Sequence, residues 1–356
     1  MVMAVGRRRA AGRKPTILPE NKEKDNCFLC SFDFQALLVP MRSDSCPDTV
    51  IAAPSVILIG PTAAGKTALS LELAHRFDAE IVSLDSMQVY RHMDIGTAKA
   101  TAEERQQVPH HLLDLVSPDE EYHAARYVRD AAEACREITA RGKLPLLVGG
   151  TGLYLKALQE GLFAIPAHDE ALRSELRERL ARQGRAALFA ELAARDPASA
   201  ARIHANDTHR LLRALEILES TGMTWGEHLS RQKPRPLLAR ALKIGLRHER
   251  PLLYERINLR VRQMVDLGLL AEVEKLTEMG YGSGLKPMQA IGYRHMLHFL
   301  ASEWSWDETL ALLARDTRRY AKRQLTWFSG DKDIHWLEPA KRQAFFDLVA
   351  AFLDAA

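Results

Sequence analysis

The stretch Gly60-Pro61-Thr62-Ala63-Ala64-Gly65-Lys66-Thr67 decides the fold. It matches the phosphate-loop pattern G-x-x-x-x-G-K-[ST], and it stands between an apolar strand expected over 56–59 and a helix expected over 66–77. The glycines let backbone amides turn toward phosphate oxygens, and the helix start adds partial positive charge. We expect Lys66 to reach the terminal phosphate and Thr67 to hold Mg²⁺. The loop predicts a phosphate site without identifying the phosphate compound.

The sequence around this loop alternates between strand and helix patterns. Further buried strands are expected over 80–84 and 144–148, a helix over 124–141, and the start of another over 152–159. Continuous apolar strands are typical of a parallel sheet covered on both faces. The sequence therefore predicts an α/β fold with a P-loop-containing parallel sheet core.

The strand pattern stops between residues 163 and 236, where the sequence is rich in Arg and Ala and helical in pattern. A strand over 241–246 and one long amphipathic helix over 252–279 follow. We therefore expect a core domain made of residues 51–162 and 237–356, interrupted by a helical insertion domain over 163–236.

Residues 1–50 lack a core pattern and are expected to be a disordered extension. Cys27 and Cys30 have the spacing of half a zinc site, but no second Cys/His pair is near, so accidental spacing is the better interpretation. The role of the pair stays open.

Composition describes a soluble globular chain of 356 residues, 47% hydrophobic and 27% charged, with a net charge of +3. Such a weak charge means that a nucleic-acid partner must be held by local Arg and Lys clusters. Four cysteines do not form a disulfide framework, and no apolar run reaches the roughly 20 residues of a membrane helix. We expect a cytoplasmic protein, with no membrane partner, that acts as a monomer.

Polar residues follow two of the predicted strands at the edge where open α/β sheets bind ligands. Asp85 and Ser86 come after the strand over 80–84. Position alone leaves Asp85 as an N-cap, a Mg²⁺ ligand through water, or a general base. Gly149, Gly150 and Thr151 follow the strand over 144–148, where many ATP-using P-loop proteins carry an acidic Mg²⁺ ligand. Thr151 could cap the next helix or face the same crevice as Asp85.

Three functions are compatible with these residues. One is transfer of a group from a diphosphate, another is a nucleoside or small-molecule kinase that uses Asp85 as a base, and the third is an RNA-binding NTP switch without transfer chemistry. Glycine at the usual acidic position weakens the ATPase interpretation without abolishing it. ATP turnover would favour the kinase, and nucleotide-dependent RNA binding without a product would favour the switch.

Seven motifs in order make the chain resemble the bacterial tRNA dimethylallyltransferases, also called tRNA isopentenyltransferases. They cover most of the chain from residue 55 to about 338. The motifs are GPTAAGKT (60–67), DSMQVYRHMDIGTAKAT (85–101), VPHHLLDLVSPDEEYHAARY (108–127), LLVGGTGLYLKAL (146–158), NDTHRLLRALEI (206–217), QAIGYR (289–294) and TRRYAKRQLTWF (317–328).

The resemblance implies that the P-loop binds the diphosphate of dimethylallyl diphosphate with Mg²⁺, the one cofactor. It implies that Asp85 accepts a proton while the N6 amine of an adenosine adjacent to the anticodon attacks. Thr151 would position the amine or the leaving oxygen, and Arg250 would hold the departing diphosphate.

For the tRNA anticodon stem-loop, the resemblance points to the helical insertion over 163–236 and to several segments of the core domain. The base must leave its stack to reach a buried diphosphate, which requires a clamp on the surrounding loop. The implied contacts are Asp85, Ser86, Met87, Gln88, Arg173, His209, Arg210, Arg213, Gln289, Gly292, Tyr293, Arg294, Lys322, Arg323 and Trp327.

The sequence departs from the family pattern at two positions. Ala64 stands where serine is common, and His209 where glutamine is common, which puts a base-specific hydrogen bond at residue 209 in doubt. Sequence after Trp336 contains no Cys/His zinc finger of the kind that eukaryotic members often add, which favours the bacterial form.

Overall fold

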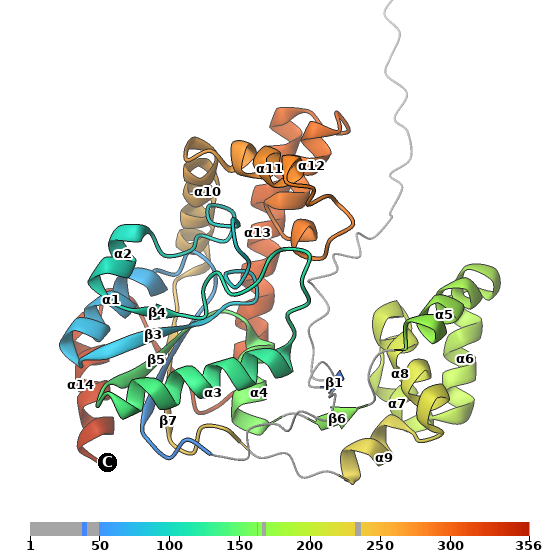
Figure 1. Cartoon of the computed structure of the whole chain (residues 1–356), viewed down its shortest axis with the longest axis horizontal. Coiled ribbons are helices and arrows are strands. Elements are labelled where there is room, and N and C mark those ends of the chain that lie inside the picture. Colours follow the sequence, from blue (N-terminus) through green and yellow to red (C-terminus); the bar gives the residue numbers. More distant parts are fainter. Residues whose placement is uncertain (1–37, 41–49, 162, 166–168, 232–235, 356) are drawn as a thin grey trace, which may run out of the picture.

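The computed structural model describes residues 38–40, 50–161, 163–165, 169–231 and 236–355 (Figure 1). Most of the predicted disordered extension, including Cys27 and Cys30, lies outside these residues. Leu38–Pro40 (β1) is an exception to that prediction, because it forms a parallel two-stranded sheet with Phe163–Ile165 (β6). The second strand lies where only helices were expected.

A six-stranded sheet forms the core, and its neighbouring strands are all parallel, as predicted. The strand order is β4-β3-β5-β2-β7-β8. Because the strands run the same way, their carboxyl ends share one edge, and the phosphate loop follows the central strand β2. The strands are β2 (Ser55–Ile59), β3 (Ala79–Leu84), β4 (His110–His111), β5 (Leu144–Gly149), β7 (Ala241–Leu246) and β8 (His335–Leu337).

Helices cover both faces of the sheet, which is why β2 is apolar at every position after its first residue. Ile57 and Ile59 pack with α3 (Ala124–Ala140) and α4 (Gly152–Glu160). The alternate residues Val56 and Leu58 pack with α1 (Lys66–Arg76) and α14 (Arg342–Asp354) on the other face. These layers are visible in Figure 1.

A helical layer stands at the carboxyl edge of the sheet, and its own core includes residues of the segment after β3 (Figure 1). The single long helix predicted over 252–279 is wrong. The chain forms two helices because Gly268 adopts a left-handed φ of 98° that ends the helical path. The elements of this layer are α10 (Arg250–Asp266), α11 (Leu269–Glu278), η2 (Pro287–Gln289), α12 (Tyr293–Leu300) and α13 (Trp306–Phe328). The short helix α2 (Ala102–Gln107) follows the segment after β3 and lies beside α1 in Figure 1.

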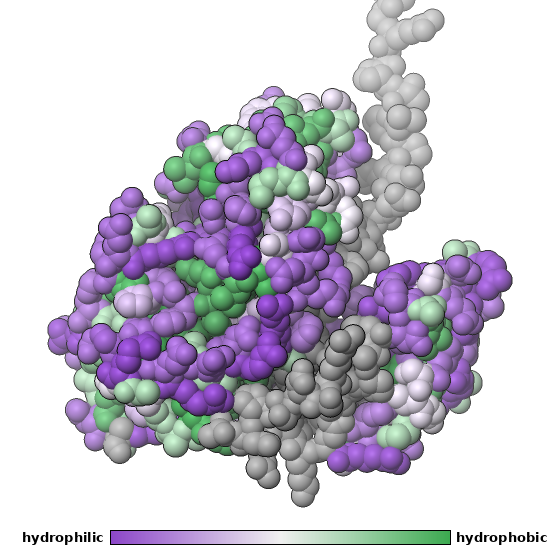
Figure 2. Space-filling model, viewed as in Figure 1, coloured by the Kyte–Doolittle hydropathy of each residue, from purple (hydrophilic) through white to green (hydrophobic). Residues whose placement is uncertain are grey.

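Five helices between residues 170 and 230 pack around a separate apolar core that includes Leu176, Leu192, Leu215 and Trp225. Figure 1 draws this group apart from the sheet, and Figure 2 shows hydrophilic residues over much of its visible face. The arrangement fits the insertion expected over 163–236. The helices are α5 (Glu170–Gln183), α6 (Arg185–Arg195), α7 (Pro197–Arg202), α8 (Thr208–Thr221) and α9 (Trp225–Ser230).

Candidate active site

The phosphate loop turns sharply between β2 and α1. Ala63 and Gly65 both have positive φ angles, 62° and 94°, so the loop bends back before the helix begins. The Lys66 ammonium donates hydrogen bonds to the carbonyl oxygens of Gly60 at 2.9 Å and Pro61 at 3.0 Å. Thr67, in the first turn of α1, is exposed on the same cavity wall. The geometry matches the loop predicted from the motif.

Gln324 of α13 joins the phosphate loop to the loop after β5. Its side-chain oxygen accepts from the amide of Thr62 at 2.8 Å, and its side-chain nitrogen donates to the carbonyl of Gly150 at 3.0 Å. The sequence analysis missed this residue. The sequence feature that could have indicated it is a polar residue on the buried face of an amphipathic helix, at helical spacing from Ala321 and Phe328.

Asp85 and Thr151 meet at the carboxyl edge of the sheet. The Asp85 Oδ1 atom accepts from the Met87 amide at 2.9 Å, and the Thr151 Oγ1 atom accepts from the Ser86 amide at 3.1 Å. The Thr151 side chain makes no capping hydrogen bond to α4. Of the two interpretations left open for this threonine, the one that faces the Asp85 crevice fits the structure.

The glycine run after β5 is required by close packing. A Cβ atom on Gly149 would lie 2.0 Å from the Leu84 carbonyl oxygen, and one on Gly150 would lie 2.2 Å from the Gln324 side-chain nitrogen. A Cβ atom on Gly152 would lie 2.2 Å from the Trp327 ring. No side chain fits at these positions, so an acidic metal ligand cannot stand there without a shift of the surrounding backbone and helix.

The arginine predicted to hold the diphosphate is not the one that the fold brings to the loop. Arg250 is exposed, donates to the Tyr254 hydroxyl at 3.0 Å and does not line the cavity. Arg256 donates from Nε to the Ala63 carbonyl at 2.8 Å, and both Arg256 and Arg260 line the cavity. The assignment of Arg250 does not fit because it lies on another face of α10. Arg256 and Arg260 are four residues apart and each precedes a buried apolar residue of α10, Ile257 or Val261. This spacing could have indicated that both arginines lie on one side of the helix.

Burial and neighbouring charges shift the acid–base groups of this site. Burial raises the pKa of Asp85, and the Met87 amide and the Lys66 charge partly offset that rise. Burial lowers the pKa of Lys66 to about 8, with a further lowering from Arg260 and an opposing effect of Asp85. Burial also lowers the pKa of Arg260. A carboxylate with a raised pKa is a better proton acceptor near neutral pH.

Predicted tRNA contacts in the insertion face the same cavity. Arg173 and Arg213 both pair with the buried Glu216, at 3.1 Å and 2.8 Å, and Arg210 pairs with Asp207 at 3.3 Å. These arginines and His209 line the cavity. The structure thus brings together the four insertion residues that the resemblance indicated, with two guanidinium groups fixed by one carboxylate.

The predicted contacts around α12 divide into two groups. Gly292 and Tyr293 both line the cavity, although the Tyr293 side chain is buried and its hydroxyl donates to Glu272 at 2.6 Å. Arg294 pairs with Asp316 at 2.5 Å, and neither Arg294 nor Gln289 lines the cavity. The tRNA contact of Tyr293 stays a prediction; its ring lies in the core of the helical layer and its hydroxyl is already bonded to Glu272.

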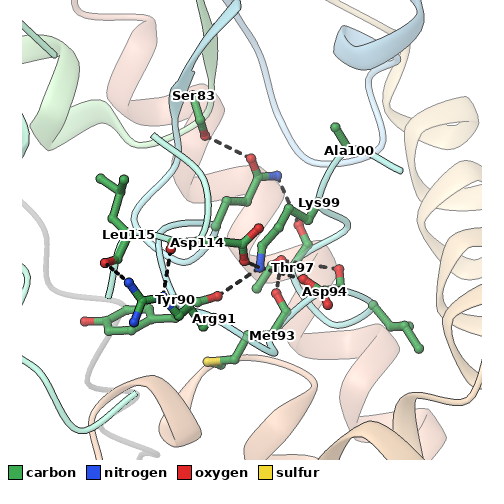
Figure 3. Close-up of polar contacts among 12 residues, drawn as sticks. Ser83, Tyr90, Arg91, Met93, Asp94, Thr97, Lys99, Ala100, Asp114 and Leu115 are labelled. Carbon is green, nitrogen blue, oxygen red and sulfur yellow. Dashed lines mark hydrogen bonds and ion pairs between the residues drawn. The ribbon is translucent and has the colours of Figure 1, made fainter. Parts of the chain in front are cut away.

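Along α13, Arg323 and Trp327 line the cavity and Lys322 is exposed outside it. Near Asp85, Ser86 and Met87 line the cavity, as does Gln88. The Gln88 side chain is nevertheless bonded within the protein. The Ser83 hydroxyl, which is labelled in Figure 3, donates to the Gln88 side-chain oxygen at 2.9 Å. Gln88 therefore joins β3 to the loop that follows, a role that the sequence did not predict.

The lining groups surround one cavity of about 1720 Å³, formed by residues of the sheet edge, the helical layer and the insertion. Figure 2 shows hydrophobic residues near the middle of the larger part of the molecule, where the loops above α3 lie. A loop with the phosphate-loop motif, a carboxylate and two guanidinium groups at the carboxyl edge of a parallel sheet define the class: an α/β protein with a P-loop type of site at its sheet edge.

Comparisons with known proteins identify the family within that class. The model for IPP transferase matches residues 88–331, and the model for isopentenyl transferase matches residues 54–118. A tRNA dimethylallyltransferase of Desulfotalea psychrophila is 52% identical over 304 residues, which cover 85% of this chain and 97% of the relative. The tRNA dimethylallyltransferase 2 of Syntrophus aciditrophicus is 50% identical, over 84% and 96% of the two chains.

Solved structures of similar proteins support the same family assignment. The tRNA isopentenylpyrophosphate transferase of Bacillus halodurans has a TM-score of 0.63 at 41% identity, covering 85% of this chain and 97% of that one. A eukaryotic dimethylallyltransferase, described as acting on tRNA, has a TM-score of 0.72 at 28% identity, covering 85% and 80%. This chain belongs to the tRNA dimethylallyltransferase family, and its enzyme class is that of the prenyltransferases. Among the described residues, no helix combines the length and apolarity needed to span a bilayer.

Proposed function

We propose that this chain transfers a dimethylallyl group from dimethylallyl diphosphate to the N6 amine of an adenosine adjacent to the anticodon in tRNA, releasing diphosphate. One observation carries the proposal: the phosphate loop, Asp85 and the insertion arginines line the same cavity. Such a cavity can hold a diphosphate at one end and a nucleic-acid base at the other. The family relationship supports the same reaction.

In this reaction the adenine N6 lone pair forms a bond to C1 of the dimethylallyl group. The C1–O bond breaks, and its electron pair leaves with the diphosphate. Asp85 accepts the proton that the amine loses, a role favoured by its raised pKa. The Thr151 hydroxyl oxygen accepts from the Ser86 amide, and its second lone pair can accept from an N–H of the amine and so position it.

The charge that builds on the leaving diphosphate has several partners in the site. The loop amides and the start of α1 favour anions, and Lys66, Arg256 and Arg260 bring three cationic groups to the same wall. Arg250 is too exposed and too far around α10 to share this role, so the proposal assigns the guanidinium contact to Arg256 and Arg260.

The residues fit a Mg²⁺ ion. Mg²⁺ in phosphate sites usually keeps several waters and takes one or two protein ligands plus phosphate oxygens. Thr67 is exposed in the first turn of α1, and no cluster of three acidic, His or Cys ligands exists among the described residues. A single hydroxyl ligand would suffice for a diphosphate complex. When bound, the ion would supply charge neutralisation to the diphosphate.

For tRNA, the proposal uses the arginines on the two sides of the cavity. Arg173 and Arg213 approach from the insertion, and Arg323 and Trp327 from α13. Guanidinium groups can hold backbone phosphates, and an indole ring can stack on an unpaired base. The substrate adenosine would leave its stack and enter between these walls. Because one chain carries both walls, we propose a monomer, which acts on tRNA in the cytoplasm.

A transfer assay tests the proposal directly. Purified protein, Mg²⁺, bulk tRNA and dimethylallyl diphosphate labelled in the prenyl group should give labelled tRNA, and nucleoside analysis should find the label on N6 of adenosine. A parallel reaction with labelled ATP should transfer no phosphate. Unlabelled tRNA in the first reaction would refute prenyl transfer, and tRNA-independent phosphoryl transfer in the second would favour a kinase instead.

A further inference from the structure

The segment from Met87 to Thr101, called the 87–101 loop here, connects β3 to α2 and forms part of the cavity wall. Met87, Gln88, Tyr90 and residues 94–101 line the cavity. The loop begins two residues after Asp85, so its shape determines the surroundings of that carboxylate. A long connection without regular structure needs specific contacts to keep one conformation.

Glu272 of α11 holds the middle of the loop. Its Oε2 atom accepts from the amides of Asp94 at 2.9 Å and Ile95 at 2.7 Å, and its Oε1 atom accepts from Gly96 at 3.1 Å. The Tyr293 hydroxyl donates to the same Oε1 at 2.6 Å. The approach is close, since a Cβ atom on Gly96 would lie 2.5 Å from the Tyr293 ring. One carboxylate therefore satisfies three consecutive backbone amides.

Lys99 holds the loop from the other side (Figure 3). Its buried ammonium donates to the Tyr90 carbonyl at 2.8 Å, to Asp94 at 2.6 Å and to Asp114 at 2.7 Å. Asp114 also pairs with Arg105 of α2 at 2.8 Å. An ammonium has three protons to donate, so every donor of this buried cation has an acceptor. Asp94 thus has its amide held by Glu272 and its carboxylate held by Lys99.

Hydrogen bonds and the short covalent connection between Gln88 and Met87 together link the middle of the loop to Asp85. The side-chain nitrogen of Gln88 donates to the backbone carbonyl oxygens of Thr97 and Ala98, both at 3.3 Å. These two residues directly follow the three whose backbone amides are bonded to Glu272. The adjacent residue Met87 donates its amide to the Asp85 carboxylate at 2.9 Å. The position of the loop is therefore passed on to the orientation of the proposed proton acceptor.

We propose that Glu272 is a positioning residue for prenyl transfer: by holding amides 94–96 it fixes the 87–101 loop and, through Gln88 and Met87, the orientation of Asp85. This inference rests on the proposed function. It distinguishes Glu272 from an ordinary structural carboxylate, because its loss should alter the chemical step and the pH profile and not only the stability of the fold.

Glu272→Gln tests the idea with little change of size. Either orientation of the new amide places an N–H group against a backbone N–H of residues 94–96, so part of the contact must open. The matched control is Glu274→Gln, which removes an exposed carboxylate two residues away on α11. Hydrogen exchange of the 87–101 loop should accelerate in the first variant and stay unchanged in the second.

In single-turnover assays with both substrates saturating, Glu272→Gln should slow prenyl transfer about tenfold, the effect of about one lost hydrogen bond to a charged group. Binding of dimethylallyl diphosphate should change less than about twofold, because no hydrogen bond among the described residues joins the 87–101 loop to residues 60–67. The acidic limb of the rate profile should move to higher pH, because the Met87 hydrogen bond lowers the pKa of Asp85 and its weakening raises that pKa.

Faster loop exchange combined with a wild-type transfer rate and an unchanged acidic limb would overturn the proposal. Unchanged loop exchange would overturn it as well, since the carboxylate would then not hold the loop. Should Glu272→Gln fold poorly, Tyr293→Phe keeps the carboxylate and removes only one donor; it should give a smaller shift in the same direction, and no shift would count against the proposal. Absence of prenyl transfer in the wild-type protein would refute the proposed function, whereas the exchange experiment still reports on the loop.

Discussion

Replacing Asp85 with asparagine should remove proton acceptance and leave the surroundings of the side chain nearly unchanged. The Oδ1 atom accepts from the Met87 amide at 2.9 Å, and an asparagine oxygen can accept the same hydrogen bond. The variant also keeps the size of the side chain at the crowded sheet edge. A positioned general base usually contributes a factor of about 10² to 10⁴, or about 2.7 to 5.5 kcal/mol. We expect transfer to slow by that factor.

The measurement is a single-turnover rate with enzyme in excess over labelled tRNA, which isolates chemistry from product release. Affinities for tRNA and for dimethylallyl diphosphate should stay within about threefold of the wild type, since neither depends on the proton. Asp119→Asn, at an exposed carboxylate outside the cavity, is the control and should behave as wild type. A rate for Asp85→Asn within about twofold of the control would refute the assignment.

The pH profile gives a second check on Asp85. Burial raises the pKa of this carboxyl above its ordinary value of 3.8. The ionised form is the active base, so transfer should be full above the raised pKa and fall as the pH drops through it. The acidic limb should therefore lie above the range of an ordinary aspartate, and Asp85→Asn should abolish it. A flat profile down to pH 4 in the wild-type enzyme would contradict the raised pKa.

Two further variants test the reassigned arginine and the glycine run. Arg256→Ala should weaken diphosphate binding by about 10- to 150-fold, the range for a lost charge-assisted hydrogen bond, whereas Arg250→Ala should change it less than about twofold in the same titration calorimetry. A larger loss of diphosphate affinity in Arg250→Ala than in Arg256→Ala would instead support Arg250 as the diphosphate-binding arginine. Gly150→Ala places a methyl group 2.2 Å from the Gln324 amide and should lower the free energy of unfolding by about 1–3 kcal/mol, measured by denaturant titration against Gly282→Ala, which has open space around it. Equal stability of the two variants would show that Gln324 yields without cost.

The parts of the fold that the sequence predicted well depend on local patterns. The strand expected over 241–246 has those bounds in the structure, and the helix expected over 124–141 ends one residue earlier. Apolar runs of four to six residues specify buried strands because both faces of the sheet are covered. Short edge strands such as β4 and β8 were missed, since two or three residues carry no detectable period.

The parts of the site that were missed depend on distant contacts. Gln324 bonds to Thr62 across 262 positions of sequence, and Glu272 bonds to Asp94 across 178. No local pattern records such pairs. The exchange of Arg250 for Arg256 has a different cause: a motif identifies the neighbourhood of a residue, but only the rotation of the helix decides which arginine faces the cavity.

The glycines after β5 connect packing to the choice of chemistry. In phosphoryl transfer the moving group carries the charge, and an acidic residue near this position commonly helps to hold the metal ions that neutralise it. Here the Leu84 carbonyl and the Gln324 amide occupy the space that such a side chain would need at Gly149 and Gly150. In prenyl transfer the moving group is a neutral hydrocarbon chain in the substrate, and the charge stays on the diphosphate beside Lys66. The packing that excludes the acidic residue is therefore compatible with a site that binds the diphosphate and transfers the hydrocarbon group.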